Sequence, residues 1–222
     1  MAFPLTHLIV AKNIIKTHGI KDEEDFLLGS IAPDAVHYRK SFVGASMAEI
    51  GKAKKTSHLC PESDEKWGSV TDNDGWLLSV KTFLGEHEKS SFRLGYATHV
   101  LTDIYNNKTI WNDFRTKHPL EAIKGYKSAY YDDLNHIDAL FKNNRIITEE
   151  ICAKLTQAKT NSIGGLVSSD EVEAIKMSIV SEYGTNNQIS NVHKKNVVNF
   201  VSYDEMLIFI KEAGLFISAI VF

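Results

Sequence analysis

The chain has 222 residues, 43% of them hydrophobic, which is enough to bury a substantial core in one large domain or two small ones. Its formal net charge is −3, and it has no basic tract beyond Lys52–Lys55. These values argue against strong nucleic-acid binding through phosphate contacts, but they leave hydrolysis of a metal-held phosphoester open.

Neither end of the sequence indicates export or a membrane span. The N-terminal stretch has no basic segment before its apolar run and no small-residue cleavage pattern, so we do not interpret it as a signal peptide. The C-terminal apolar run LFISAIVF is much shorter than the roughly twenty residues that cross a bilayer. Two widely separated cysteines are typical of a reducing compartment. We therefore expect a cytoplasmic protein, with a membrane-surface role as the alternative.

Apolar side chains at helical spacing predict a succession of helices, bounded by capping residues or by proline and glycine. In chain order we expect helices over residues 4–18, 22–28, 75–88, 91–107, 120–142, 149–159, 170–183 and 203–221. Residues 41–51 are weakly periodic and predict a loop with a short helix, and we expect connections over 111–119, 160–169 and 185–196. No hairpin signal lies between alternating strands, so the predicted fold class is all-α.

Three of the acidic and histidine residues in the first 60 positions have ordinary structural explanations when each is taken alone. Pro33 disfavours helix at Ala32, which places Asp34 in a rigid turn, and turn aspartates commonly bond to the backbone. His7 lies in the first turn of the first helix, where histidines usually cap or face solvent. His58 lies in a turn-rich segment.

Residues 91–107 are the stretch around which the rest of the chain is organised. They are apolar on nearly every side, which is typical of a buried helix. His99 and Asp103 are nevertheless four apart, so both project from one face. A buried carboxylate without a partner costs on the order of several kcal/mol, so Asp103 needs either a metal ion or a hydrogen-bonded histidine. Gly95 would let another backbone approach closely.

The predicted helix over 120–142 carries a second carboxylate–histidine combination. Asp132 is four residues before His136, and Asp133 is three residues before it, so either aspartate can pair with the histidine. Two such pairs on neighbouring helices favour a metal site over two isolated core histidines.

The candidate ligands combine imidazole and carboxylate without thiolate, which suits zinc in a hydrolytic site, or iron or manganese. Several carboxylates favour more than one ion, because each can bridge two. Two ions about 3.5–4 Å apart can hold a water as hydroxide and clamp a phosphoester. The predicted ligands are His7, Asp34, His58, His99, Asp103, Asp132 and His136.

Four motifs occur in the order THLIVAKNI, FLLGSIAPD, SHLCP and FRLGYATHVLTDIYNN. Over Pro4–Asp138 this order resembles the zinc-dependent phospholipase C family, which shares its fold with nucleases of the S1/P1 type. The resemblance implies a multi-helix bundle of the phospholipase C/P1 nuclease type that holds two or three zinc ions. It also implies hydrolysis of a small phosphoester or a phospholipid headgroup, with a metal-activated water attacking phosphorus.

The resemblance also implies roles for individual residues. Asp34 matches the aspartate that contacts the metal-bound water and is the candidate general base. His58, His99 and Asp103 match the ligands of one ion, Asp103 also bridging, and His7 matches a ligand of a second.

The later part of the chain departs from the family pattern. Asn106 and Asn107 stand where a further histidine is expected, and Asp132-x-x-x-His136 reverses the usual order of histidine and carboxylate. One metal position is therefore lost or rebuilt.

Two other readings compete with a phospholipase C-like hydrolase. A degenerate family member would hold metal as a binding protein. A phosphohydrolase of the HD type would need an adjacent His-Asp dipeptide, which this sequence lacks. For all three readings we expect one helical domain over 1–222, with a metal-site portion over 1–142 and packing helices over 143–222.

Overall fold

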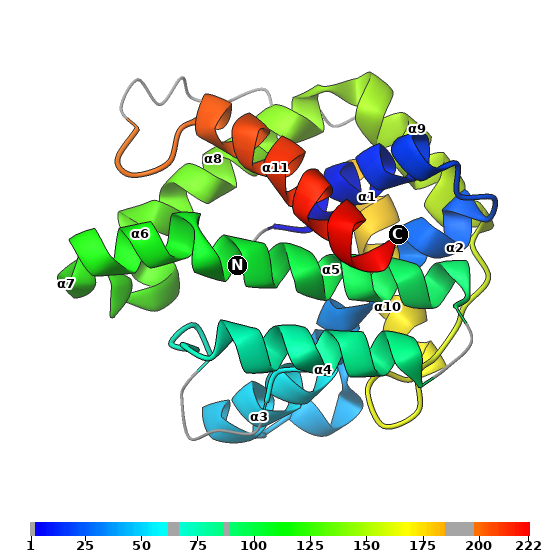
Figure 1. The fold of residues 1–222 in the computed structure, drawn as a ribbon, viewed down its shortest axis with the longest axis horizontal. Helices are drawn as coiled ribbons and strands as arrows, with labels where there is room; N and C mark the ends of the chain where they lie inside the picture. The colour runs from blue at the N-terminus through cyan, green and yellow to red at the C-terminus, as the bar shows by residue number, and fades with distance from the viewer. Residues whose placement is uncertain (1–2, 62–66, 87–88, 185–197) are drawn as a thin grey trace.

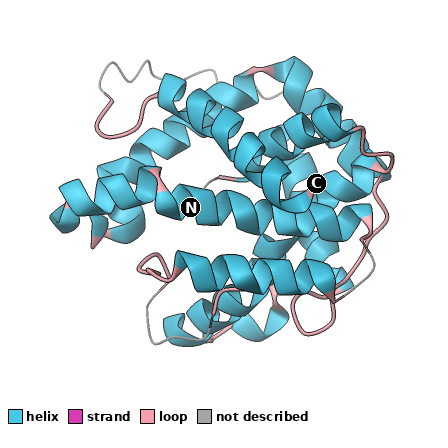
Figure 2. Cartoon of the chain, in the orientation of Figure 1, coloured by secondary structure: helices cyan, strands magenta, loops and turns pink. Residues whose placement is uncertain are grey.

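A computed structural model describes residues 3–61, 67–86, 89–184 and 198–222. Within these ranges the regular structure is helical and no strand occurs, apart from an isolated bridge between Ile163 and Val167 (Figure 2). The all-α fold class predicted from the sequence is confirmed. The expected connection over residues 185–196 lies outside the described residues.

The α-helices are α1 Pro4–His18, α2 Glu23–Gly29, α3 Met47–Ser57, α4 Asn73–Gly85, α5 Ser91–Lys108, α6 Ile110–Lys117, α7 Pro119–Ala122, α8 Ala129–Asn143, α9 Arg145–Gln157, α10 Ser169–Tyr183 and α11 Tyr203–Val221. Three 3₁₀ helices join them: η1 Ala32–Tyr38, η2 Lys40–Phe42 and η3 Gly125–Lys127.

Helix α5 runs through the middle of the molecule, with α4 along one side and α1, α2 and α11 packed on others (Figure 1). Its buried positions lie on all sides, as predicted for residues 91–107. The closest crossing is with α2, because a Cβ at Gly95 would overlap the carbonyl oxygen of Phe26, and one at Gly29 would overlap that of Phe92. Gly95 thus admits a neighbouring backbone, as expected, and α2 places the start of η1 beside α5.

The last third of the chain packs against the segments that precede it. Helix α10 contacts η1, α9 contacts α2, and α11 contacts both α1 and α5. Arg39, which follows η1, binds the carboxylate of Glu171 on α10 with an Nε–Oε1 distance of 2.6 Å. The division into a metal-site portion and packing helices stays a prediction.

Residue Ala32 is helical, so the extended conformation that we expected before Pro33 is wrong. Pro33 lies in the first turn of η1, where its missing N–H is not required for an intrahelical hydrogen bond. Asp34, which we expected in a rigid turn, lies in the first turn of a 3₁₀ helix.

Residues 41–51 were expected to form a loop with a short helix, and the helix that starts there runs beyond residue 51. Ser46 and Glu49 form a capping box that starts α3, which continues to Ser57. Residues 110–117, expected as a connection, form the helix α6, which buries Trp111 and Phe114.

The single helix predicted over 120–142 is wrong, because the structure divides it into α7, η3 and α8. The interruption includes Gly125, whose φ of 56° lies in the left-handed region that favours glycine. Ser128 then precedes the first turn of α8.

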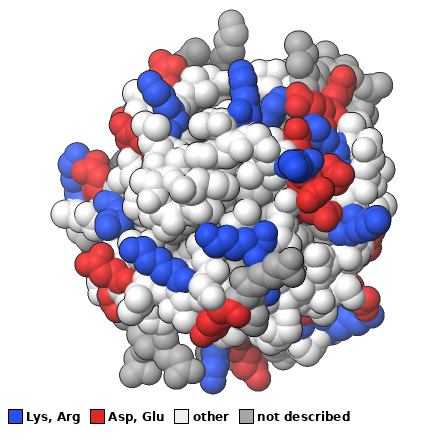
Figure 3. All heavy atoms as spheres, turned by 45° about the vertical axis from the view of Figure 1, so that its right-hand side comes forward, with Lys and Arg blue, Asp and Glu red and all other residues white. Residues whose placement is uncertain are grey.

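The final helix agrees with prediction, since Ser202 caps α11 and the helix ends at Val221. No helix in the described ranges is both long and apolar enough to cross a membrane. On the face drawn in Figure 3, acidic and basic side chains are interspersed.

Candidate metal centre

Five of the seven predicted ligands converge inside the molecule. They come from four elements: His7 from α1, Asp34 from η1, His58 from the C-terminal cap of α3, and both His99 and Asp103 from α5. The three histidines and Asp103 have side chains that are at most 1% exposed. Asp34, with 20% exposure, stands where the cluster approaches solvent.

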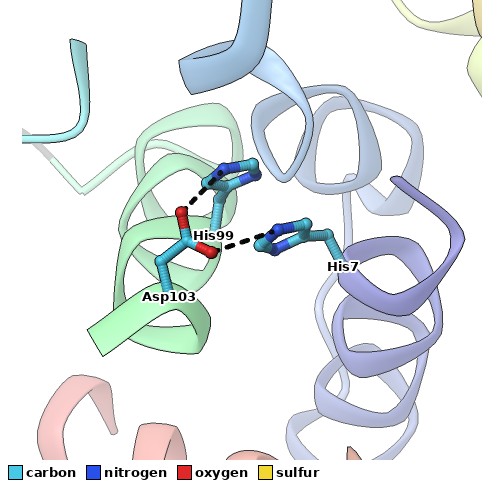
Figure 4. Close-up of side chains that lie close together, drawn as sticks. All are labelled: His7, His99 and Asp103. Carbon is cyan, nitrogen blue, oxygen red and sulfur yellow. Dashed lines mark ion pairs between the residues drawn. The ribbon is translucent and has the colours of Figure 1, made fainter. Parts of the chain in front are cut away.

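The carboxylate of Asp103 faces all three imidazoles. Its Oδ1 lies 3.6 Å from Nε2 of His7, and its Oδ2 lies 3.6 Å from Nε2 of His58 and 3.8 Å from Nε2 of His99. Figure 4 shows the pairs with His7 and His99. Neither oxygen has a hydrogen-bond partner in the described part of the chain. A buried carboxylate without hydrogen bonds is costly, and a bound cation would remove that cost.

Backbone carbonyls fix the tautomers of His58 and His99. Nδ1 of His99 lies 2.7 Å from the carbonyl oxygen of Ser30, and Nδ1 of His58 lies 2.9 Å from that of Lys54. A carbonyl oxygen only accepts, so each Nδ1 carries the hydrogen and each Nε2 presents a lone pair. The two Nε2 atoms are 3.3 Å apart, and in these tautomers neither can donate to the other. This is the orientation in which histidine binds a metal while its second nitrogen is held by the protein.

His7 is the third imidazole of the cluster. Its ring stacks on that of His99, with centroids 3.7 Å apart and planes inclined by 6°. Neither of its ring nitrogens has a hydrogen-bond partner among the described residues. Burial lowers the pKa of His7 and holds the pKa of His99 well below its usual range. Both rings are therefore neutral near pH 7, which is the form that ligates a metal.

The donor atoms form two adjacent groups, within each of which all atoms lie within 4.8 Å of one another. One group is His7, His99 and Asp103, and the other is Asp34, His58 and His99. Each group thus offers the kind of donor atoms that could hold a metal ion. Imidazole and carboxylate donors without thiolate suit zinc, and also iron or manganese.

Asp34 forms the outer side of the cluster. Its Oδ1 lies 3.4 Å from Nε2 of His58, and its Oδ2 lies 3.8 Å from Nε2 of His99. Burial raises the pKa of this carboxyl, but the Lys54 ammonium outweighs burial and holds the pKa well below its usual range. Asp34 is therefore ionised and available as a ligand.

Sequence reasoning missed Lys54, whose Nζ lies 3.1 Å from Oδ1 of Asp34 and 2.9 Å from Nε2 of His37. We noted Lys54 only as part of a basic tract, which suggests a solvated helix face. One signal was present, because Lys54 precedes His58 by four residues and so shares its side of α3.

The structure does not bring Asp132 and His136 into the cluster. Asp132 is exposed, His136 is half-buried, and neither belongs to either group of converging donor atoms. Asp133 is buried, but its carboxylate accepts hydrogen bonds from the backbone N–H groups of residues 199–201, which commits it to the connection before α11. The reason lies in the backbone: α8 starts only after the interruption at η3, and its buried face carries Tyr130 and Leu134.

Three other histidines were not among the predicted ligands. His118 is exposed, and His87 and His193 lie outside the described residues.

Residues 6–161 match a protein-family model described as zinc dependent phospholipase C. The matched range contains all five converging residues and extends further along the chain than the motifs quoted above. Comparisons with curated proteins and with solved structures found no match.

Proposed function

Because the chain belongs to the zinc dependent phospholipase C family, we propose that it is a metal-dependent hydrolase of phosphoesters. The observation that carries this proposal is the buried Asp103 carboxylate, which lacks hydrogen bonds and faces three imidazole nitrogens. A buried carboxylate without hydrogen bonds destabilises the folded protein unless a cation binds it.

We further propose that two ions bind, with zinc as the expected metal and iron or manganese as alternatives. His7 and Asp34 would serve different ions, because each belongs to only one of the two groups of donor atoms. His99 belongs to both groups but offers one lone pair, so it would serve a single ion. Asp103 has two oxygens directed at different histidines, which suits it to bridging. A third ion is not part of the proposal, since Asp132 and His136 lie outside the cluster.

When bound, two such ions lower the pKa of a coordinated water and neutralise charge on the phosphoryl group. His7, Asp34, His58, His99 and Asp103 would hold the ions. Four of these five ligands are shielded from solvent, and Asp34 lies at the exposed side. Asp34 lies beside the Nε2 atoms of His58 and His99, an arrangement that suits it to metal ligation. The general-base role implied by the family resemblance stays a prediction.

The substrate that we propose is a small phosphoester or a phospholipid headgroup. The sparse use of cysteine, with two such residues in the chain, supports the cytoplasmic location that we infer.

Hydrolysis of a chromogenic phosphodiester by the metal-loaded protein tests the proposal. We expect turnover that a chelator abolishes and added zinc restores. Asp34→Asn is expected to lower kcat/KM by about 100-fold or more, because it removes an ionised ligand. Asp132→Asn is the matched control and should leave turnover unchanged, since Asp132 is exposed and outside the cluster.

Two results would count against hydrolysis. If a metal-loaded protein shows no turnover on a broad panel of phosphomonoesters and phosphodiesters, the chain is a metal-containing binding protein. If Asp34→Asn and Asp132→Asn behave alike, the chemistry does not occur at this cluster.

A further inference from the structure

Lys54 is a buried cation at the side of the metal centre, and the proposed function does not yet use it. The residue is 7% exposed. Its Nζ lies 3.1 Å from Oδ1 of Asp34, 2.9 Å from Nε2 of His37 and 5.4 Å from the centre of the Trp67 ring. A lysine is normally protonated near pH 7, and the ion pair with Asp34 stabilises the ammonium form of Lys54.

Solvent reaches the cluster from the side on which Lys54 lies. The side chains of Asp34 and His37 are 20% and 42% exposed, whereas those of His7, His58, His99 and Asp103 are at most 1% exposed. A ligand that arrives from solvent therefore approaches past Asp34 and its two neighbours, His37 and Lys54.

The ammonium of Lys54 also has spare hydrogen-bonding capacity. It carries three N–H donors. The structure gives it two hydrogen-bond acceptors among the described residues, Asp34 and His37. The third donor of this positive group thus has no acceptor among the described residues.

We propose that Lys54 is a substrate-binding residue whose ammonium donates a hydrogen bond to a phosphoryl oxygen of the phosphoester. The inference rests on the proposed function and adds a fixed protein cation to the charges that recognise the substrate. A compact ammonium on a flexible stem suits contact with a phosphoryl oxygen, and a charge-assisted hydrogen bond of this kind is stronger than a neutral one.

The competing explanation is that Lys54 only holds Asp34 in place. An ion pair of that kind would fix the ligand and influence metal binding, but it would not contact the substrate. The two explanations differ in the binding of a free phosphate ion, which contacts the substrate site without any reaction.

Titration calorimetry with inorganic phosphate on metal-loaded protein separates the two explanations. Lys54→Met keeps the length of the side chain and removes the charge, and we expect it to weaken phosphate binding by about 10- to 100-fold. Metal content should stay unchanged, and KM for a phosphomonoester should rise more than kcat falls. Lys54→Arg restores the charge and should recover most of the affinity.

Lys176→Met is the matched control. Lys176 is buried to the same degree, at 8% exposure, and its Nζ lies 2.7 Å from a carboxylate oxygen of Glu173, on α10. This variant should lose stability without any change in phosphate affinity.

Several outcomes would overturn the inference. The inference fails if Lys54→Met binds phosphate as tightly as the wild type, or if the metal-loaded wild type binds no phosphate. It also fails if metal loss accounts for the whole effect. Each of these results would leave the proposed function intact. A wild-type protein that takes up no metal would overturn the proposed function and this inference together.

Discussion

Replacing Asp103 with asparagine is expected to change stability in opposite directions with and without metal. In metal-free protein the variant removes a buried carboxylate that has no hydrogen bonds, and its amide can donate to a histidine Nε2. An unsatisfied buried group costs about 1–3 kcal/mol, and each kcal/mol moves the Tm of a chain of this size by about 2–4 °C. We therefore expect the metal-free variant to melt roughly 2–12 °C above the metal-free wild type.

With metal the order reverses. An ion present at 100 times its Kd stabilises the wild type by about 2.7 kcal/mol for each site. The asparagine variant binds the ions more weakly and therefore lacks much of this stabilisation. Thermal unfolding of both proteins in chelator and in excess zinc measures the two differences.

Asp133→Asn is the control, because Asp133 is a buried carboxylate whose hydrogen bonds are satisfied. It accepts from the backbone of residues 199–201 and from the Asn199 amide at 2.7–3.2 Å. This variant should be destabilised in both conditions. The reasoning is refuted if Asp103→Asn is destabilised in chelator to the same extent as Asp133→Asn, or if zinc stabilises Asp103→Asn as much as the wild type.

Two further predictions concern packing and pH. Gly95→Ala would place its Cβ on the carbonyl of Phe26, so we expect a loss of at least about 2 kcal/mol in urea unfolding, and a change within about 0.5 kcal/mol would contradict the close crossing of α2 and α5. Burial raises the pKa of Asp138 from 3.8 to about 6, so the folded state holds this proton more tightly than the unfolded state does, and stability is lost as pH rises through that range. Asp138→Asn removes this loss and should stabilise the protein at pH 8 more than at pH 4.5, and equal effects at the two pH values would be inconsistent with the raised pKa.

The spacing of residues in the sequence correctly predicted the features that depend on a single helix. His99 and Asp103 lie four apart on an apolar helix, and α5 is buried with both side chains on one face. Gly95 indicated a close backbone approach for the same local reason, because only the absence of a side chain admits α2.

Features that depend on distant contacts were predicted less well. Asp132 and His136 have the same spacing as His99 and Asp103, but the face of α8 that turns inward depends on where that helix starts, and the interruption near Gly125 sets that point. The burial of Lys54 depends on contacts with η1, so the basic tract in which it lies suggested a solvated face.

The convergence of five residues from four elements was accessible only through the order of the motifs. No spacing rule connects His7, Asp34 and His58, which lie on separate segments. The family resemblance supplied that connection, and the family match over residues 6–161 agrees with it.

The number of metal ions bound per chain tests the central claim most directly. Elemental analysis of purified, zinc-equilibrated protein should give two ions per chain for the wild type and for His136→Ala, and fewer for His99→Ala, because His99 belongs to both groups of donor atoms. A wild type without bound metal, or a His99→Ala variant that binds as many ions as the wild type, would contradict the account.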